Sequence, residues 1–310
     1  MQGKTKYIFI VYYLFASFLY GCTEKKDVKP DQADTLKQQD VKSDLGNIEE
    51  LLRGYDYNAV IDKFLPILPD GFSVINFKYF VIFSDLDEKL TYTLIDNDIR
   101  NTIECMKNNY SQTLPGEVTS IIIFNDFDKY KKFVLANYDI PEHDISPYGF
   151  YKISKNVIVI RYVSWKGSLM HELTHRFLRS DFPDIPSWFD EGFAALHEKS
   201  SFKNGVLKGE FSWRIISIRR AFDENKYTGL KTLMETNDDE LYGKRSTFYY
   251  AQARYLLMYL QEKDLLKDYY NLFKSTYHKD ETGITQLEKI LKKPIDEIDE
   301  DLEAYLKSFN

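Results

Sequence analysis

Residues 171–175 read His-Glu-Leu-Thr-His and lie in a segment, 168–180, whose apolar residues recur at helical spacing. Positions i and i+4 share one face of a helix, so the imidazoles of His171 and His175 reach toward one ion. Neutral imidazole is a preferred ligand of Zn²⁺. Glu172 adjoins the first ligand, where it can take a proton from a water molecule at the open position of the ion. The segment therefore predicts a zinc-binding helix that carries its own general base.

A catalytic zinc site needs a third protein ligand, and several residues after this helix are candidates. Asp181 has the spacing at which metzincin-like enzymes place that ligand, but Leu178 stands where their pattern needs a glycine for a sharp turn. His197 and Glu198 are expected on a solvated helix end. All three positions are weaker candidates than the carboxylate that lies between them.

Glu191 is the best third ligand that the sequence offers. Pro186 suits the first turn of a helix, and fifteen residues separate His175 from Glu191. This length lets the chain leave the first helix, turn back and run a second, antiparallel helix beside it. Gly192 allows a close helix approach, and Asp190, about 100° round the helix from Glu191, is expected to be a solvated or capping carboxylate. The predicted donor set is two imidazoles and one carboxylate.

These segments together resemble a known enzyme family. His-Glu-Leu-Thr-His at 171–175, followed by Trp-Phe-Asp-Glu-Gly-Phe-Ala at 188–194, is similar to the gluzincin metallopeptidases, specifically the peptidase MA-like family, with a more distant likeness to the aminopeptidase N family. The resemblance covers roughly residues 74–308. It implies a zincin-like fold, one Zn²⁺ per chain and Glu191 as third ligand. It also implies an edge strand before the catalytic helix that binds the extended substrate by β-addition, for which 157–161 is the candidate.

A second segment, Tyr-Ala-Gln-Ala-Arg-Tyr-Leu-Leu-Met-Tyr-Leu at 250–260, resembles the helix whose first tyrosine binds the oxyanion in aminopeptidase-like gluzincins. The resemblance implies that Tyr250 is catalytic, as a donor to the developing charge. Whether Tyr249 or Tyr250 faces the zinc stays open, and Tyr250 as one more core aromatic is the alternative. The Gly-x-Met-Glu-Asn segment of aminopeptidase N enzymes does not occur between Pro147 and Met170. An aminopeptidase of that type is therefore not expected, and an endopeptidase is left open.

The start of the chain predicts export. Lys4 and Lys6 precede an apolar and aromatic run at 7–19 that is too short to span a bilayer comfortably and is typical of a secretory signal peptide. An uncleaved anchor is the alternative. Leu-Tyr-Gly-Cys at 19–22 resembles a bacterial lipobox, which implies cleavage of a lipoprotein signal peptide at 1–21.

The same resemblance implies a lipid anchor on Cys22. Residues 22–46 are polar and cannot bury enough apolar surface to fold, so they are predicted to be a flexible tether. Thr23, in place of an aspartate after the cysteine, favours the outer membrane. We therefore expect an exported protein that is lipid-anchored in the bacterial cell envelope.

Composition limits the remaining possibilities. The chain has 310 residues, 22 Phe and 24 Tyr, which supports a sizeable aromatic core. Its net charge of -7 argues against a nucleic-acid partner. Two cysteines exclude a disulfide scaffold, and Cys105 is expected to be a small buried hydrophobe.

Hydrophobic patterning predicts an α+β fold, in which a small mixed sheet and the zinc-binding helix precede a mostly helical C-terminal half. The expected catalytic unit is 47–308, with an α/β half at about 70–180 and a helical half at about 181–308. Strands are predicted at 74–84, 118–124, 149–153 and 157–163, the last two as a hairpin. Helices are predicted at 47–64, 86–110, 127–138, 168–180, 186–199, 211–224, 246–263, 265–277, 283–292 and 295–308.

The sequence thus predicts a zinc metallopeptidase that acts on extracytoplasmic peptides or proteins. His171, His175 and Glu191 would bind the metal, and Glu172 and Tyr250 would act on the substrate. The rival is a catalytically silent gluzincin-fold lipoprotein that serves as an envelope binding module. A zinc hydrolase of non-peptide substrates is a third possibility. The substrate and the oligomeric state cannot be read from the residues.

Overall fold

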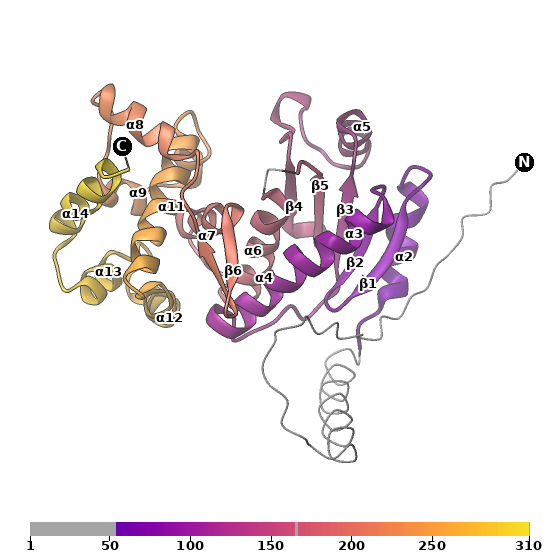
Figure 1. The fold of residues 1–310 in the computed structure, drawn as a ribbon, viewed down its shortest axis with the longest axis horizontal. Coiled ribbons are helices and arrows are strands. Elements are labelled where there is room, and N and C mark those ends of the chain that lie inside the picture. The colour runs from indigo at the N-terminus through magenta and orange to yellow at the C-terminus, as the bar shows by residue number, and fades with distance from the viewer. Residues whose placement is uncertain (1–53, 165–166, 310) are drawn as a thin grey trace, which may run out of the picture. The chain divides into compact units, whose positions relative to one another are not determined.

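The computed structural model describes residues 54–164 and 167–309. The predicted signal peptide, the tether and the lipidation site at Cys22 lie outside the described residues. Within the described part, the chain is an α+β protein whose C-terminal half is mostly helical, as predicted (Figure 1). No helix in this part is long and apolar enough to cross a lipid bilayer.

Five strands form one mixed sheet in the order β1-β2-β3-β5-β4. Their bounds are β1 (Ser73–Phe77), β2 (Phe80–Ser84), β3 (Thr119–Phe124), β4 (Gly149–Lys152) and β5 (Val157–Arg161). The single strand predicted at 74–84 is wrong, because Lys78 takes a positive φ of 51° and a turn separates two strands there. The predicted hairpin is confirmed: β4 pairs antiparallel with β5, with Tyr151 opposite Ile158.

Strand β4, and not β5, lies at the edge of the sheet. The prediction that 157–161 is the edge strand is therefore wrong. Val157, Ile158 and Val159 are fully buried, which suits an interior strand that is covered on both faces. On this side of the sheet the strand that can receive an added strand is β4, which ends just before the short connection to β5; β1 is the edge strand on the other side.

The described chain divides into two compact units, one of residues 54–83 and 117–121 and the other of 84–116 and 122–309. The first unit holds β1, β2, α2 (Tyr57–Phe64) and the short η1 (Leu65–Ile67). Helix α2 begins at Tyr57 because the side chain of Asp56 caps it, accepting a hydrogen bond from the backbone of Ala59. It ends at Phe64, before Pro66, as predicted, but the helix predicted at 47–64 is wrong at residues 54–56, which are not helical and where Gly54 has a φ of 117°.

The second unit holds the His-Glu-Leu-Thr-His motif and most of the helices. Residues 88–110 are helical throughout, with two π-helical turns, and their segments are α3 (Glu88–Leu94), η2 (Ile95–Ile99), α4 (Arg100–Cys105) and η3 (Met106–Tyr110). The remaining elements are α5 (Phe127–Asn137), η4 (Glu142–Asp144), η5 (Ile153–Lys155), α6 (Ser168–Asp181), α7 (Ser187–Glu198), β6 (Ser200–Lys203), β7 (Val206–Gly209), α8 (Ile215–Asp223), α9 (Leu230–Met234), α10 (Asp238–Leu241), α11 (Ser246–Glu262), α12 (Leu266–Thr276), η6 (Tyr277–Lys279), α13 (Ile284–Leu291) and α14 (Ile295–Lys307). The β6–β7 hairpin was not predicted.

Helix α7 packs between α6 and α11 (Figure 1). A Cβ on Gly167, just before α6, would overlap the carbonyl oxygen of Glu198 at the end of α7, so the two helices run antiparallel, as predicted. On the α11 side, a Cβ on Gly192 would lie 3.0 Å from the Cβ of Ala253. The predicted close approach at Gly192 is thus made to α11. These contacts fix the position of α7 between α6 and α11.

Candidate metal centre

Helix α6 presents two histidines from successive turns. The rings of His171 and His175 lie edge to face, with centroids 4.8 Å apart. Most of α6 is buried, including Leu173 and Phe177, so the helix cannot rotate to expose the imidazoles. The motif helix is therefore packed within the unit, and the side chains of His171 and His175 are only 12% and 10% exposed.

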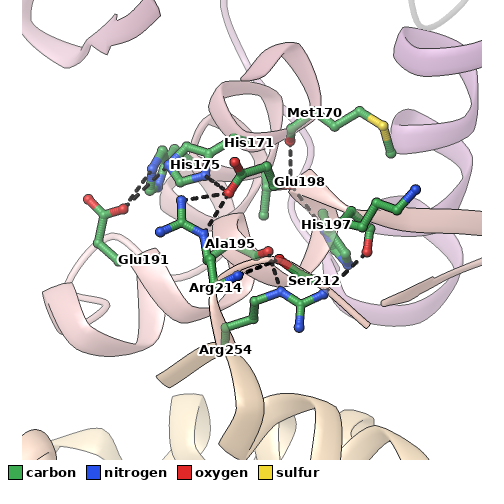
Figure 2. A network of polar contacts seen from close by, with 12 residues as sticks. Met170, His171, His175, Glu191, Ala195, His197, Glu198, Ser212, Arg214 and Arg254 are labelled. Atoms are coloured by element: carbon green, nitrogen blue, oxygen red, sulfur yellow. Dashed lines mark hydrogen bonds and ion pairs between the residues drawn. The ribbon is translucent and has the colours of Figure 1, made fainter. Parts of the chain in front are cut away.

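Helix α7 brings one carboxylate to both rings. Glu191 Oε2 lies 3.4 Å from His171 Nε2 and 3.5 Å from His175 Nε2 (Figure 2). Among the described residues, these three form the one group of His, Cys, Asp and Glu side chains whose ligand atoms converge closely enough to hold a metal ion. The structure thus brings together the three predicted ligands.

The two distances from Glu191 Oε2 fit a tetrahedral ion, and all three ligand atoms lie within 4.8 Å of one another. Bonds of about 2.05 Å at tetrahedral angles place ligand atoms about 3.3 Å apart, close to both distances from Glu191 Oε2. This oxygen is buried, and the imidazole nitrogens of His171 and His175 lie beside it. A buried carboxylate needs a compensating positive charge, and a bound cation can supply that charge. The group can hold a metal ion, and its donors are ones that Zn²⁺ accepts.

The protonation of the group without metal follows from its burial and its charges. Burial works against the charged forms of both His175 and Glu191. The carboxylates of Asp190 and Glu191 outweigh that effect and raise the pKa of His175 well above its usual value. The same attraction, together with hydrogen bonds from both imidazoles, holds the pKa of Glu191 well below its usual value. A cation that binds here displaces a proton.

Asp190 orients one of the ligands. Its Oδ1 lies 2.8 Å from His175 Nδ1, and its Oδ2 lies 2.7 Å from Arg179 Nη2. The side chain is only 1% exposed, so the prediction of a solvated or capping carboxylate is wrong. A bond from Nδ1–H to a carboxylate fixes the imidazole with the Nε2 lone pair toward the metal position.

Glu198 stands near the other imidazole without bonding it. Its Oε2 is 4.0 Å from His171 Nδ1, and it accepts two hydrogen bonds from Arg214, at 2.9 Å from Nε and 2.6 Å from Nη2 (Figure 2). The side chains of Glu198 and Arg214 are 14% and 11% exposed. The predicted solvated helix end is therefore wrong at this residue.

The prediction of a solvated helix end is also wrong at His197, because this residue is fully buried. Its Nδ1 lies 3.0 Å from the hydroxyl of Thr174, which itself donates to the carbonyl of Met170. This chain of contacts joins α7 to the motif helix. Burial and the nearby Arg254 lower the pKa of His197 to about 3, so the ring is neutral and serves the packing of the two helices.

A cavity of about 390 Å³ opens beside the three ligands, and Glu172 lines it. Burial raises the pKa of Glu172, while the two neighbouring imidazoles and a backbone hydrogen bond from Tyr151 oppose that rise. Its carboxyl group is thus close to both the metal position and the edge strand β4. Gly149, Phe150 and Tyr151 of β4 line the same cavity.

Two tyrosines, Tyr242 and Tyr250, lie close to Glu191. The hydroxyl of Tyr242 is 3.1 Å from Glu191 Oε1, and the rings of Tyr242 and Tyr250 lie edge to face with centroids 6.3 Å apart. Both line the cavity, whereas Tyr249 does not. Burial and the charge of Glu191 raise the pKa of both Tyr242 and Tyr250, so both phenols stay protonated. The structure places Tyr250 on the cavity side of α11, and adds Tyr242, which the sequence did not indicate.

Asp181 has a structural role. It accepts hydrogen bonds from the backbone of Thr113, from the hydroxyl of Tyr270 and from Lys274, which fixes the end of α6. It is not part of the converging group, which agrees with the lower rank it had as a third ligand. Cys105 is fully buried, as expected, and its sulfur accepts a hydrogen bond from the backbone of Leu207.

Comparison of the sequence with protein-family models and with curated proteins finds no match. The case for a function therefore rests on the residues and the geometry of this site.

Proposed function

We propose that the chain is a zinc-dependent metallopeptidase that hydrolyses peptide bonds in extracytoplasmic peptides or proteins. The observation that carries the proposal is the convergence of His171, His175 and Glu191 on one point beside Glu172, at the wall of a cavity. Two imidazoles and one carboxylate are the ligand set of a class of catalytic zinc sites that keep a position for water or substrate.

When bound, the ion supplies Lewis-acid polarisation of the scissile carbonyl and lowers the pKa of a water molecule. Glu172 accepts the proton of the attacking water and passes it to the leaving amine. Burial raises the pKa of this carboxyl group, which brings its proton affinity closer to that needed for both transfers. The imidazoles beside it limit that rise and keep the base available.

Tyr250 is the proposed donor to the carbonyl oxygen as charge develops on it. Its phenol lines the cavity and has a raised pKa, so it stays protonated at neutral pH. Loss of one preorganised donor of this kind costs about 3–4 kcal/mol of transition-state stabilisation. A hydrogen bond with Glu191 contributes to the raised pKa of Tyr250, and the hydroxyl of Tyr242 donates to Glu191 Oε1 at 3.1 Å. That bond leaves Oε2 as the single oxygen directed at the imidazoles.

The substrate would lie along β4. This strand is at the edge of the sheet and lines the cavity, so an extended peptide can pair with it by β-addition. Gly149 begins β4 with a φ of 153°, and a Cβ there would lie 2.6 Å from Ile160 Cδ1. The start of the edge strand thus depends on a glycine.

The alternative function is that of a catalytically silent binding module. A fourth protein ligand at the metal position or a blocked groove would support that alternative. Among the described residues, the converging group has three members and an open cavity adjoins them, which favours the peptidase. The place of action, outside the cytoplasm on a lipid anchor at Cys22, is proposed from the first residues of the sequence.

The test is a paired measurement on the full-length chain in detergent. We expect about one bound zinc per chain and cleavage of a mixed peptide library. Glu172→Gln should keep the zinc and lose cleavage, whereas Glu142→Gln, a matched change at an exposed residue outside the cavity, should keep both. Zinc without cleavage by the wild type would support the binding module. Failure to bind zinc even when it is added would refute the proposal.

A further inference from the structure

The side chain of Arg214 lines the cavity and has no part in the chemistry proposed above. It comes from the loop between β7 and α8, at the N-cap position of α8. Its guanidinium group is held on three sides. Glu198 takes two of its hydrogen bonds, the ring of Trp213 lies 4.9 Å from the guanidinium carbon, and the ring of Tyr250 lies 5.6 Å from it. The charge is therefore fixed in position before any ligand arrives.

A guanidinium group offers two edges, and Glu198 uses only one. Nε and Nη2 both donate to the same oxygen, Glu198 Oε2. The other edge consists of Nη1 and the second N–H of Nη2, which donate to none of the described residues. Figure 2 shows one guanidinium nitrogen of Arg214 pointing away from Glu198, toward the side on which Glu191 lies. A planar edge of two N–H groups matches the two oxygens of a carboxylate.

The charges around the cavity permit a carboxylate at this edge. The lining acids are Glu172, Glu191 and Glu198, and the lining cations are Arg179 and Arg214. Glu191 faces the metal position, where a divalent cation more than offsets its charge. Glu198 is held on the opposite edge of Arg214 through a single oxygen. The free edge is therefore the positive side of this ion pair, on a guanidinium group whose carbon lies 5.6 Å from the ring of Tyr250.

We propose that Arg214 binds a carboxylate of the substrate, so that the preferred substrates are peptides with a carboxylate close to the scissile bond. This inference rests on the proposed function, because Tyr250 marks the position of the scissile carbonyl. The carboxylate comes either from an Asp or Glu side chain or from the free carboxyl terminus. A terminal carboxylate would make the chain a carboxyl-terminal exopeptidase.

The test uses matched peptide pairs against matched protein variants. The peptides differ by Glu or Gln at each position in turn, and by a free acid or an amide at the carboxyl terminus. Wild type should cleave the preferred carboxylate member with a kcat/KM about tenfold or more above its amide partner, as expected for hydrogen bonds to a charged group. Arg214→Lys keeps the charge but loses the planar edge, and the preference should shrink to about threefold or less.

Binding supplies a second readout that needs no turnover. Calorimetry of the same pairs on zinc-loaded Glu172→Gln protein, with and without Arg214→Lys, isolates the contribution of Arg214, because any contact of a carboxylate with the ion is common to both proteins. If Arg214→Lys unfolds the site, the double variant Arg214→Met with Glu198→Gln removes both charges together and leaves neither unpaired.

The outcomes separate the two proposals. Cleavage with equal rates for acid and amide members, or an equal loss for both in Arg214→Lys, would overturn the carboxylate site and leave the peptidase standing. Cleavage of no peptide by wild type would count against the peptidase, and the binding arm would still decide whether Arg214 selects a carboxylate. Whichever pair shows the preference identifies the source of the carboxylate.

Discussion

Replacement of Asp190 by Asn should weaken zinc binding by about ten- to hundredfold. Asp190 bonds to donors on both sides, His175 Nδ1 at 2.8 Å and Arg179 Nη2 at 2.7 Å. An asparagine amide has one acceptor oxygen, so one of these contacts is lost and its NH₂ group faces a donor. A hydrogen bond to a charged group contributes about 1.5–3 kcal/mol, and about 1.4 kcal/mol is tenfold in affinity.

The control lies at the other histidine. Glu198 Oε2 is 4.0 Å from His171 Nδ1, which is too far for a hydrogen bond. Glu198→Gln is the same kind of substitution, at a carboxylate that is also paired with an arginine. We expect it to change zinc affinity by less than about threefold, since the ligand is not oriented through this contact.

The assay is competition for Zn²⁺ with a chromophoric chelator at neutral pH. Thermal unfolding of the metal-free variants shows whether each substitution leaves the fold intact. Equal losses of affinity in Asp190→Asn and Glu198→Gln would contradict an orienting role of Asp190, because they would show that charge near the site matters and the hydrogen bond does not. An unchanged affinity in Asp190→Asn would refute it as well.

Two further predictions concern the tyrosine pair and the buried histidine. Tyr242→Phe should lower zinc affinity and change the absorption spectrum of a Co²⁺-substituted protein, because Glu191 Oε1 loses its donor. Tyr250 also interacts with Glu191, but Tyr250→Phe should lower the affinity less than Tyr242→Phe and should lower kcat by about a hundredfold or more. Exchanged phenotypes would contradict this division. His197 has a folded-state pKa lowered to about 3 by burial and by Arg254, so the stability it contributes is present above the unfolded pKa of about 6.5 and is lost as the pH falls toward 3. Acid unfolding of wild type and of His197→Gln should therefore differ in steepness within this window, and parallel curves would refute the assignment.

The ligands could be predicted from sequence because their geometry is local. His171 and His175 are one helical turn apart, and a short connection returns the chain to place Glu191 beside them. The helices were also predictable, because α6, α7 and α11 to α14 match the expected segments within a few residues. Each of these features depends on neighbours in the chain or on a pattern with a fixed period.

The surroundings of the ligands could not be predicted in the same way. His197 and Glu198 resemble a solvated helix end when only α7 is considered. Their burial is decided by Arg214 and by Arg254, which donates to the carbonyl of Ala195 near the end of α7. Nothing in the spacing of these residues indicates that the arginines meet this helix.

The β6–β7 hairpin was missed although its turn was visible in the sequence. Asn204 and Gly205 connect the two strands with φ values of 52° and 77°. Asn-Gly between two short extended segments is the strongest local signal for a two-residue hairpin turn. The hairpin interrupts a half of the chain whose hydrophobic pattern is otherwise helical. It leads to Glu210, whose backbone carbonyl accepts a hydrogen bond from Arg254.

We expect the metal affinity of this chain to depend on how closely three helices pack. Gly192 adjoins Glu191, and it lets α7 sit so near α11 that a Cβ would lie 3.0 Å from Ala253. On the other side, Gly167 leaves room for the carbonyl of Glu198. Metal–ligand bonds tolerate deviations of only about 0.2 Å. A methyl group added at Gly192 would push α7 away from α11 and move Glu191 Oε2 by more than that tolerance. The contacts that pack α7 therefore also set the position of this metal ligand.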